Sequence, residues 1–252
     1  MTFPDLRETP GTPSRPGLEL YELAPWRSRF GVVAGITSRS TDFTLGGAPP
    51  TGDPAAHWDA FRALQQARFP SIRVGYQCHG TRVAAHQYGA PGLVLIPDTD
   101  GHVTEEGGVL LGITVADCIP VYLTTTDGAG VGLLHVGWRG LASGIIEQGV
   151  PAFRAATGGT PSKIVSHCGV GICRGCYEVG PEVVRQVLGE ETAGPTPLDL
   201  RAAVALRLTR LGVPEVTLSP WCTAHDAVRF HSHRASGGRS GRMLAFVGRP
   251  LA

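Results

Sequence analysis

The sequence has almost no net charge and no long apolar run. Its 22 Lys and Arg residues are balanced by 21 Asp and Glu residues, so the formal charge is +1 at pH 7. Such a chain has no overall field that would attract a nucleic-acid backbone or an anionic membrane. It also lacks the roughly 18 consecutive apolar residues of a membrane span and the cationic start of a secretory signal. We therefore expect a cytoplasmic protein without nucleic-acid or membrane partners, as a monomer or small homo-oligomer.

Sulfur-containing residues and histidines are also few. Six cysteines in 252 residues are too sparse for a disulfide-stapled fold, and in the cytoplasm they stay reduced and available for metal binding or catalysis. The sequence has two methionines and nine histidines, and two of the histidines, His231 and His233, form the one His-x-His pair. A laccase cluster needs several such pairs and a blue-copper cysteine that often has an axial methionine. The composition argues against laccase chemistry.

The pattern of hydrophobic residues predicts an α+β fold in one domain. Residues 1–28 are rich in proline and charge and predict a mostly extended N-terminal arm, and residues 29–252 predict a single catalytic domain. Strands and helices are mixed too irregularly for a doubly wound nucleotide-binding sheet. We expect strands at 29–37, 71–80, 108–126 (broken around 117–120), 130–140, 163–167, 213–223 and 241–248; a loop at 46–54; and helices after Asp53 and at 141–157, 181–188 and 198–212.

Three of the expected strand ends carry side chains that bind metals: His79, Cys118 and His135. A catalytic zinc takes three protein ligands and leaves its fourth position to water, whose pKa it lowers. Taken singly, each residue is ordinary, because cysteines are often buried and histidines are often hydrogen-bonded in cores. Together they predict one open metal site that holds zinc. Copper accepts the same imidazole and thiolate donors and is the less favoured alternative.

The third strand end leads into a helix that has the features of an anion site. The word GWRGL opens this helix, and its free backbone N–H groups together with Arg139 suit a phosphate group.

Several words in the same order make the chain resemble a known family. It looks like the YfiH-like family, also called the laccase-domain or multicopper polyphenol oxidase family. The words that carry the resemblance are QCHGTRV (77–83), TVADCIPV (114–121), HVGWRGLASG (135–144), YEVGPEV (177–183) and CT (222–223).

The resemblance implies a fold, a metal and a reaction. The fold is two packed β-sheets flanked by helices, also described as like that of cytotoxic necrotizing factor. His79, Cys118 and His135 are then the zinc ligands. The implied chemistry is phosphorolysis of adenosine, inosine, guanosine or methylthioadenosine, together with adenosine deamination, so the partners are a purine nucleoside and phosphate.

Other residues receive roles within this scheme. Arg139 and Arg39 are candidate phosphate ligands, and Asp117 either transfers a proton or orients its loop. The remaining candidates for the pocket are Gln77, Tyr177 and Glu178, with His231 and His233 as weaker ones.

Three alternatives remain open. Cys118 and His135 also suit a metal-free hydrolase, in which the histidine deprotonates the thiol for attack on an amide; such an enzyme does not need His79. The family's older name suggests a second hypothesis, a copper-dependent polyphenol oxidase. A non-enzymatic, metal-stabilised binding protein would need a closed site, for which Cys78 is the extra ligand to check.

A second group of cysteines has its own spacing. Cys168, Cys173 and Cys176 form C-x4-C-x2-C, which together with Cys222 is similar to the spacing of a plant-type two-iron cluster. Ordinary buried thiols are the alternative. His86, His102, His167 and His225 are expected to be ordinary core or surface histidines.

Overall fold

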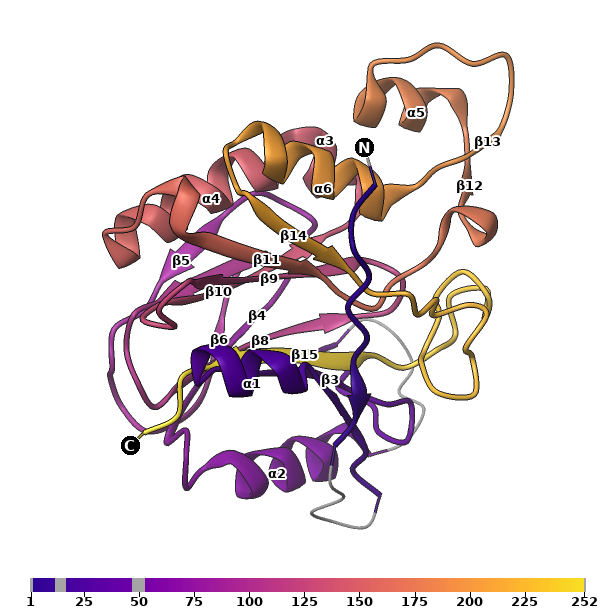
Figure 1. Ribbon diagram of the computed structural model, residues 1–252. Helices are drawn as coiled ribbons and strands as arrows, with labels where there is room; N and C mark the ends of the chain where they lie inside the picture. The colour runs from indigo at the N-terminus through magenta and orange to yellow at the C-terminus, as the bar shows by residue number, and fades with distance from the viewer. Residues whose placement is uncertain (1, 12–16, 47–52, 252) are drawn as a thin grey trace.

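Two β-sheets packed face to face form the centre of the molecule (Figure 1). The computed structural model describes residues 2–11, 17–46 and 53–251. Strands of the first, seven-stranded sheet are, in spatial order, β1 (Thr9–Pro10), β2 (Leu20–Glu22), β3 (Val33–Thr37), β15 (Met243–Gly248), β8 (Val109–Val115), β4 (Ser71–Gly75) and β6 (Gly92–Ile96).

The second sheet has six strands and includes His135 and the strand that follows Cys118. Its order is β14 (Glu215–Leu218), β11 (Ile164–Cys168), β9 (Ile119–Thr125), β10 (Val131–Val136), β7 (Gly101–Thr104) and β5 (Val83–Ala85). A small third sheet pairs β12 (Glu178–Val179) with β13 (Thr196–Pro197).

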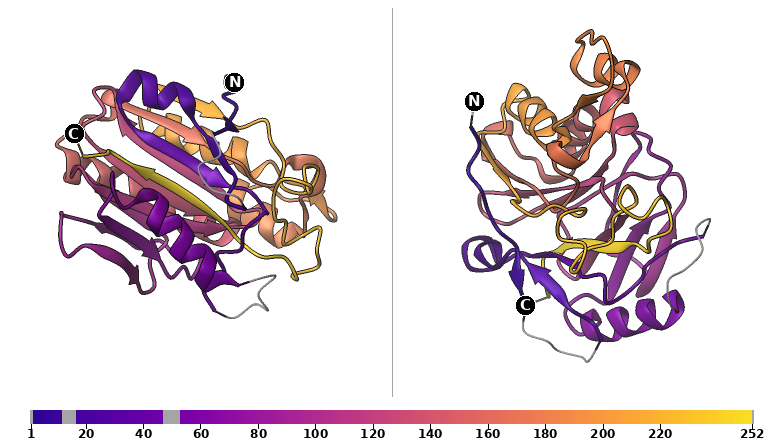
Figure 2. Two further views of the ribbon diagram at one scale, coloured as in Figure 1. Left: turned by 90° about the horizontal axis from the view of Figure 1, so that it is seen from below. Right: turned by 90° about the vertical axis from the view of Figure 1, so that its right-hand side faces the viewer.

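Helices cover the outer faces of the two sheets (Figures 1 and 2). The six-stranded sheet packs against α3 (Trp138–Ser143), α4 (Ile145–Thr157) and α6 (Leu200–Arg210), with α5 (Pro181–Leu188) beyond them. The seven-stranded sheet packs against α2 (Pro54–Gln65), and α1 (Ala24–Phe30) lies beside the interface between the sheets. Among the described residues, none of the helices has the length and apolar character to cross a bilayer. The predicted α+β fold of two packed sheets flanked by helices is confirmed.

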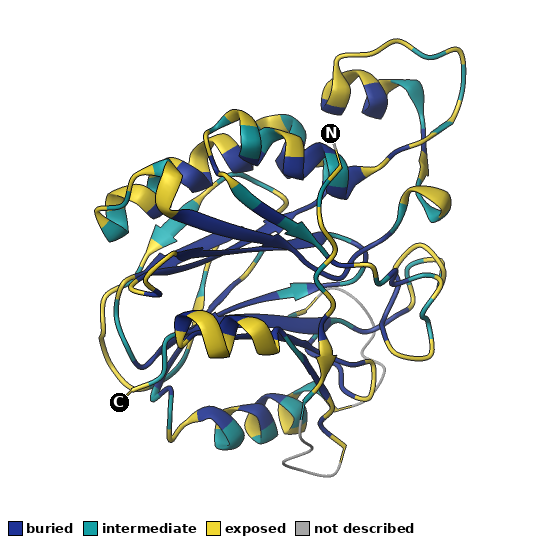
Figure 3. Cartoon of the chain, in the orientation of Figure 1, coloured by how far each residue is buried: buried dark blue, intermediate teal, exposed yellow. Residues whose placement is uncertain are grey.

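The central strands of both sheets are buried on both faces, whereas the edge strands β1, β5, β6 and β14 are partly or fully exposed (Figure 3). Between the sheets, Leu111 and Ile113 of β8 pack in one cluster with Tyr122 of β9 and Leu133 of β10, all fully buried. Tyr122 also donates a hydrogen bond of 2.9 Å to the Gly35 carbonyl and so joins the two sheets directly. The continuous apolar runs of β8, β9 and β10 explain why the sequence predicts strands there.

Capping residues define the helix starts that the sequence indicated. The Asp53 carboxylate accepts the Ala56 amide at 3.2 Å at the start of α2, and Asp199 accepts Ala202 at 2.9 Å at the start of α6. The helix predicted at 141–157 is divided, because Gly144 has a φ of 93° and ends α3 before α4 begins. The loop predicted at 46–54 lies mostly outside the described residues.

The arm predicted as mostly extended over residues 1–28 ends in a helix, which the prediction did not include. Residues 20–22 form β2, and Ala24–Phe30 form α1, because Pro25 occupies the first turn of a helix and Trp26 and Phe30 can bury their rings. Pro13 and Pro16 lie outside the described residues.

The first half of the arm is extended and touches both sheets. Pro4 and Leu6 exchange backbone hydrogen bonds with Leu218 at the end of β14, whereas β1 pairs with β2. Between them, the fully buried Glu8 carboxylate contacts His167 Nε2 at 3.0 Å and accepts the Ser219 hydroxyl at 2.6 Å. A buried carboxylate with these partners fixes the arm in place.

We predict that Glu8→Ala lowers the free energy of unfolding by about 3–5 kcal/mol, because it leaves the buried His167 and Ser219 without their partner. The matched control is Glu215→Ala, which breaks a solvent-exposed ion pair with Arg29 and is expected to cost far less. Urea unfolding of both variants measures the difference, and equal losses would contradict the buried role of Glu8.

Candidate metal centre and active-site pocket

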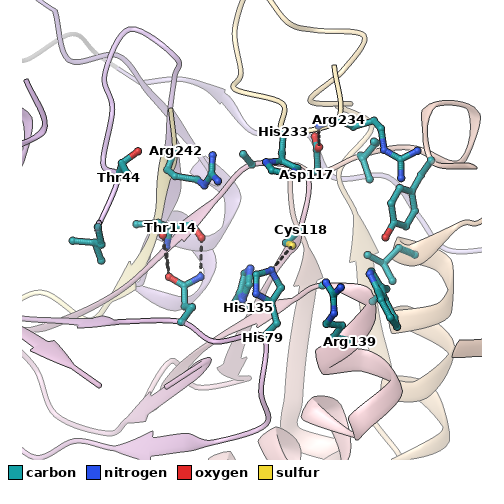
Figure 4. Close-up of a pocket in the computed structure, with 18 of the residues that line it drawn as sticks. Thr44, His79, Thr114, Asp117, Cys118, His135, Arg139, His233, Arg234 and Arg242 are labelled. Carbon is teal, nitrogen blue, oxygen red and sulfur yellow. Dashed lines mark hydrogen bonds between the residues drawn. The ribbon is translucent and has the colours of Figure 1, made fainter. Parts of the chain in front are cut away.

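A cavity of about 490 Å³ opens where the chain crosses from one sheet to the other. The crossing is the segment between β8 and β9, which holds Asp117 and Cys118. Figure 4 shows that His79, Cys118 and His135 lie in the middle of this cavity, with arginine side chains on both sides of them. The cavity is therefore formed by both sheets together.

His79, Cys118 and His135 converge although they come from three separate elements. Their ligand atoms all lie within 4.8 Å of one another, and Cys118 Sγ lies 3.8 Å from His79 Nε2. His79 lies in the turn after β4, whereas His135 is in β10 and is 3% exposed. Two imidazoles and one thiolate at this spacing are a suitable donor set for zinc.

The buried carboxylate of Asp100 orients both histidines. One oxygen accepts from His135 Nδ1 at 2.8 Å and from the His79 amide at 3.0 Å; the other accepts the amides of Cys78 and Gly80. Because a carboxylate only accepts, His135 must donate through Nδ1 and keep Nε2 free for a metal. Asp100, which directly precedes β7, was not among the residues predicted for the site.

The backbone at the site is held in uncommon conformations. His79 has a φ of 60° and Asp117 a φ of 84°, both in the left-handed region that non-glycine residues rarely adopt. A Cβ added at Gly137 would lie 3.0 Å from both Cys118 Sγ and His79 Cδ2. Glycine at this position therefore lets the three donors approach one another without a shift of Cys118 or His79.

The charges of Cys118 and His135 support each other. Burial would raise the pKa of the Cys118 thiol, but His135 and His79 lower it to about 6. Burial would lower the pKa of His135, but the Cys118 thiolate and Asp100 raise it to about 9. The protein thus stabilises the thiolate, which is the form that binds a metal, and a metal ion would replace the proton on His135.

Cys78 does not join these three ligands. Its Sγ lies 3.4 Å from Asp100 and not with the other donor atoms. Within the described part of the chain, the three donors therefore form an open site, as a catalytic metal requires.

Asp117 lines the cavity, but its carboxylate is already engaged. One oxygen accepts the Thr223 hydroxyl at 2.6 Å, and the other accepts the Arg234 amide at 2.7 Å. Of its two predicted roles, these contacts favour orientation of the loops.

Three arginines line the cavity: Arg139, Arg234 and Arg242. Arg139 lies over the Trp138 ring at 4.5 Å, and Arg234 lies over the Tyr177 ring at 5.1 Å. Arg39 does not line the cavity, because its guanidinium donates to the Ala227 carbonyl. Arg234 and Arg242 lie in the region after β14, where the sequence offered no spacing that placed them.

The other predicted pocket residues differ in position. Tyr177 lines the cavity, and burial followed by the Cys118 charge raises its pKa to about 12. Gln77 also lines it, but its amide bonds the backbone of Thr114 in both directions, at 2.7 and 2.8 Å, and so joins the ends of β4 and β8. Glu178 is exposed and outside the lining.

Among the weaker candidates, His233 lines the cavity and His231 does not, because His231 Nε2 contacts the Thr41 carbonyl. His167 is a buried core residue, and His86 Nε2 lies 2.8 Å from His102 Nδ1. These three histidines lie outside the cavity lining, as predicted. His225 is not ordinary: it lies against Cys173 and Cys176.

The fold and the site define a class of protein: an α+β two-sheet protein with a His-Cys-His donor set in a cavity at the crossing between the sheets. A family model described as multi-copper polyphenol oxidoreductase laccase matches residues 45–250. The chain belongs to this laccase-like, YfiH-type family, as the motifs predicted.

Relatives in this family carry two activity names. The chain is 35% identical over 229 residues, 87% of this chain and 92% of the relative, to purine nucleoside phosphorylase SCO2081 of Streptomyces coelicolor. It is 32% identical over 161 residues to adenosine deaminase RL5 of an unknown prokaryotic organism, covering 59% of this chain and 61% of the relative.

A third relative has a solved structure. The chain is 39% identical over 167 residues, 61% of each chain, to purine nucleoside phosphorylase YlmD of Geobacillus stearothermophilus. The sequence match thus spans about three fifths of that relative's length. The crystal structure of YlmD superposes with a TM-score of 0.83 at 29% identity, covering 97% of this chain and all of the other.

We predict that Asp100→Asn weakens metal binding by about 10- to 100-fold, because the amide cannot accept from His135 and three backbone amides at once. The exposed Asp98→Asn, at a position whose left-handed backbone asparagine tolerates, is the control and leaves affinity unchanged. Competition against a chelator measures the affinity; an Asp100→Asn variant that binds metal as tightly as the parent would exclude this role.

Proposed function

We propose that the chain is a zinc-dependent purine nucleoside phosphorylase that acts on adenosine, inosine, guanosine and methylthioadenosine and also deaminates adenosine. The observation that carries the proposal is an open His-Cys-His donor set in a cavity that also contains three arginines. The names of the relatives agree with both reactions.

Zinc is the metal we assign to His79, Cys118 and His135. Zinc binds thiolate and imidazole in three-ligand sites that stay open. It supplies Lewis acidity, which polarises the bound nucleoside and makes water a stronger nucleophile. Since a thiolate ligand must stay reduced, the proposal includes a cytoplasmic setting.

The arginines provide the phosphate site. In phosphorolysis a phosphate oxygen attacks ribose C1′, the bond from C1′ to the purine nitrogen breaks, and the departing base takes up a proton. Arg139 lines the cavity with its guanidinium over the Trp138 ring, so its N–H donors are available to a phosphate in the cavity. Arg234, on the same side of the three donors as Arg139, and Arg242, on the other side, add positive charge (Figure 4).

Copper oxidase chemistry fits the described residues poorly. A blue-copper site with His and Cys ligands commonly adds a weak axial methionine. Met243 is fully buried in β15, where its sulfur accepts the His231 amide at 2.8 Å, away from the cavity lining. The second histidine pair, His86 and His102, also lies outside the lining.

A metal-free cysteine hydrolase is the second candidate, and one observation favours it. Cys118, His135 and Asp100 form a thiolate, imidazole and carboxylate series of the kind that activates a nucleophile. His79 separates the two proposals: its Nε2 is aimed at the same sulfur, a contact that a metal site needs and a cysteine nucleophile does not.

We predict that chelation, or His79→Ala, lowers adenine formation from adenosine and phosphate by at least about 1,000-fold, because a ligand of the metal is lost. Chromatography of the products with and without phosphate measures it: adenine requires phosphate, whereas inosine forms without it.

The control for this experiment is His57→Gln, which changes a histidine outside the cavity and keeps full activity. Full turnover by the thoroughly chelated protein would exclude the zinc mechanism. Amide hydrolysis that survives both chelation and His79→Ala would establish the hydrolase instead.

We further predict that Arg139→Gln lowers kcat/KM for phosphate by roughly 10- to 100-fold, the value of one or two charge-assisted hydrogen bonds. Deamination, which uses water, changes by less than about 3-fold, because it needs no phosphate ligand. Arg62→Gln, on the exposed face of α2, is the control. An equal loss in both reactions would show that Arg139 does not act on phosphate.

A further inference from the structure

Three cysteines and one histidine outside the cavity form a second cluster. Cys173, Cys176, Cys222 and His225 each offer one ligand atom, and these atoms all lie within 4.8 Å of one another. In the sequence they read as two short pairs, Cys-x2-Cys and Cys-x2-His, separated by a long segment. This pairing of two short turns is typical of structural zinc sites.

The backbone brings the two pairs together. Residues 174–176 form a short 3-10 turn, in which the Cys176 amide donates to the Cys173 carbonyl at 3.1 Å. Cys222 lies opposite Gly171 in an isolated β-bridge, so the second pair is held beside the first. The Cys173 amide then donates to Cys222 Sγ at 3.3 Å. An amide hydrogen bond to a ligand sulfur stabilises its thiolate form.

His225 completes the cluster from the exposed side. Its Nδ1 lies 3.6 Å from Cys173 Sγ, and its Nε2 lies 3.1 Å from Cys176 Sγ. In a tetrahedral zinc site with sulfur at about 2.3 Å and nitrogen at about 2.0 Å, neighbouring ligand atoms are roughly 3.5–3.8 Å apart. The four side chains are therefore close to the arrangement that zinc requires.

The ligand types favour zinc over an iron–sulfur cluster. The iron hypothesis requires Cys168, but this residue is fully buried in β11 and is absent from the cluster. Burial raises the pKa of the Cys168 thiol to about 12, so it stays protonated. Three thiolates and one imidazole in a closed set match the Cys3His pattern of structural zinc.

We propose that Cys173, Cys176, Cys222 and His225 bind a second zinc ion with a structural role. The site shares no residue with His79, Cys118 and His135, so its occupancy is independent of the proposed catalysis.

The second zinc would fix one wall of the cavity. The first pair of ligands lies beside Ile172 and Tyr177, which line the cavity, and the second lies on the loop that carries Arg234. Arg234 donates to the Glu178 carbonyl at 2.8 Å across these same two segments. A metal that joins the segments therefore holds the Arg234 and Tyr177 side chains where substrate would meet them.

Metal analysis of the full chain, purified under reducing conditions from zinc-supplemented cells, tests the proposal. The expected result is two zinc ions per chain in the parent, one in Cys173→Ser/Cys176→Ser and one in His79→Ala. Cys168→Ala is the matched control and keeps two. A parent with zinc only at the His79 centre would overturn the proposal, as would iron with acid-labile sulfide or a disulfide between these cysteines.

Cobalt binding provides a readout that does not need the double variant to fold. Chelated His79→Ala protein titrated with Co²⁺ is expected to develop strong thiolate-to-cobalt charge-transfer absorption that saturates at one equivalent. The exposed His225→Gln change should weaken binding by at least about 10-fold, because one of four ligands is lost. No charge-transfer absorption in the His79→Ala protein would contradict the second site, whatever the outcome for nucleoside turnover.

Discussion

The carboxylate of Asp100 is the interaction on which the site depends. It accepts the Nδ1 proton of His135 and three successive backbone amides that include that of His79. Burial would raise the pKa of Asp100, but these hydrogen bonds hold it below its usual range, so the group stays charged. One carboxylate thereby fixes the ring of one histidine and the left-handed backbone of the other.

The fold supplies this carboxylate at the point where its two sheets meet. His79 follows a strand of one sheet, His135 belongs to the other, and Cys118 lies on the crossing between them. The apolar cluster between the sheets and the buried Tyr122 hold this crossing rigid. Part of the remaining wall consists of two loop segments, which the second cysteine and histidine cluster joins at Cys173 and Cys222. Rigid strands thus position the donors, and loops line part of the cavity around them.

Much of this arrangement can be predicted from the sequence. The long apolar runs predict strands, and the motif words identify the family together with the three donors. The same patterns do not reveal Asp100, because its role depends on contacts that form only when β7 packs beside the turn after β4. Nor do they place Arg234 or exclude Arg39, since local sequence does not show whether a long side chain reaches a cavity or a backbone carbonyl.

The N-terminal helix and His225 also could not be predicted from the local sequence. Proline and charge in residues 1–28 predict extended chain, but the burial of Trp26 against Tyr122, with ring centroids 6.3 Å apart, stabilises α1 instead. His225 looks ordinary until the fold brings Cys173 and Cys176 beside it. In both cases a contact between distant segments overrides the local pattern.

In the proposed enzyme, His79, Cys118 and His135 together hold one open catalytic zinc. Anomalous diffraction at the zinc edge, from crystals of active protein, tests it most directly. We expect a peak about 2.0–2.1 Å from one nitrogen of each histidine and about 2.3 Å from Cys118 Sγ, with a fourth ligand that is not a protein side chain. Fully active crystals without a peak between these three residues would contradict it.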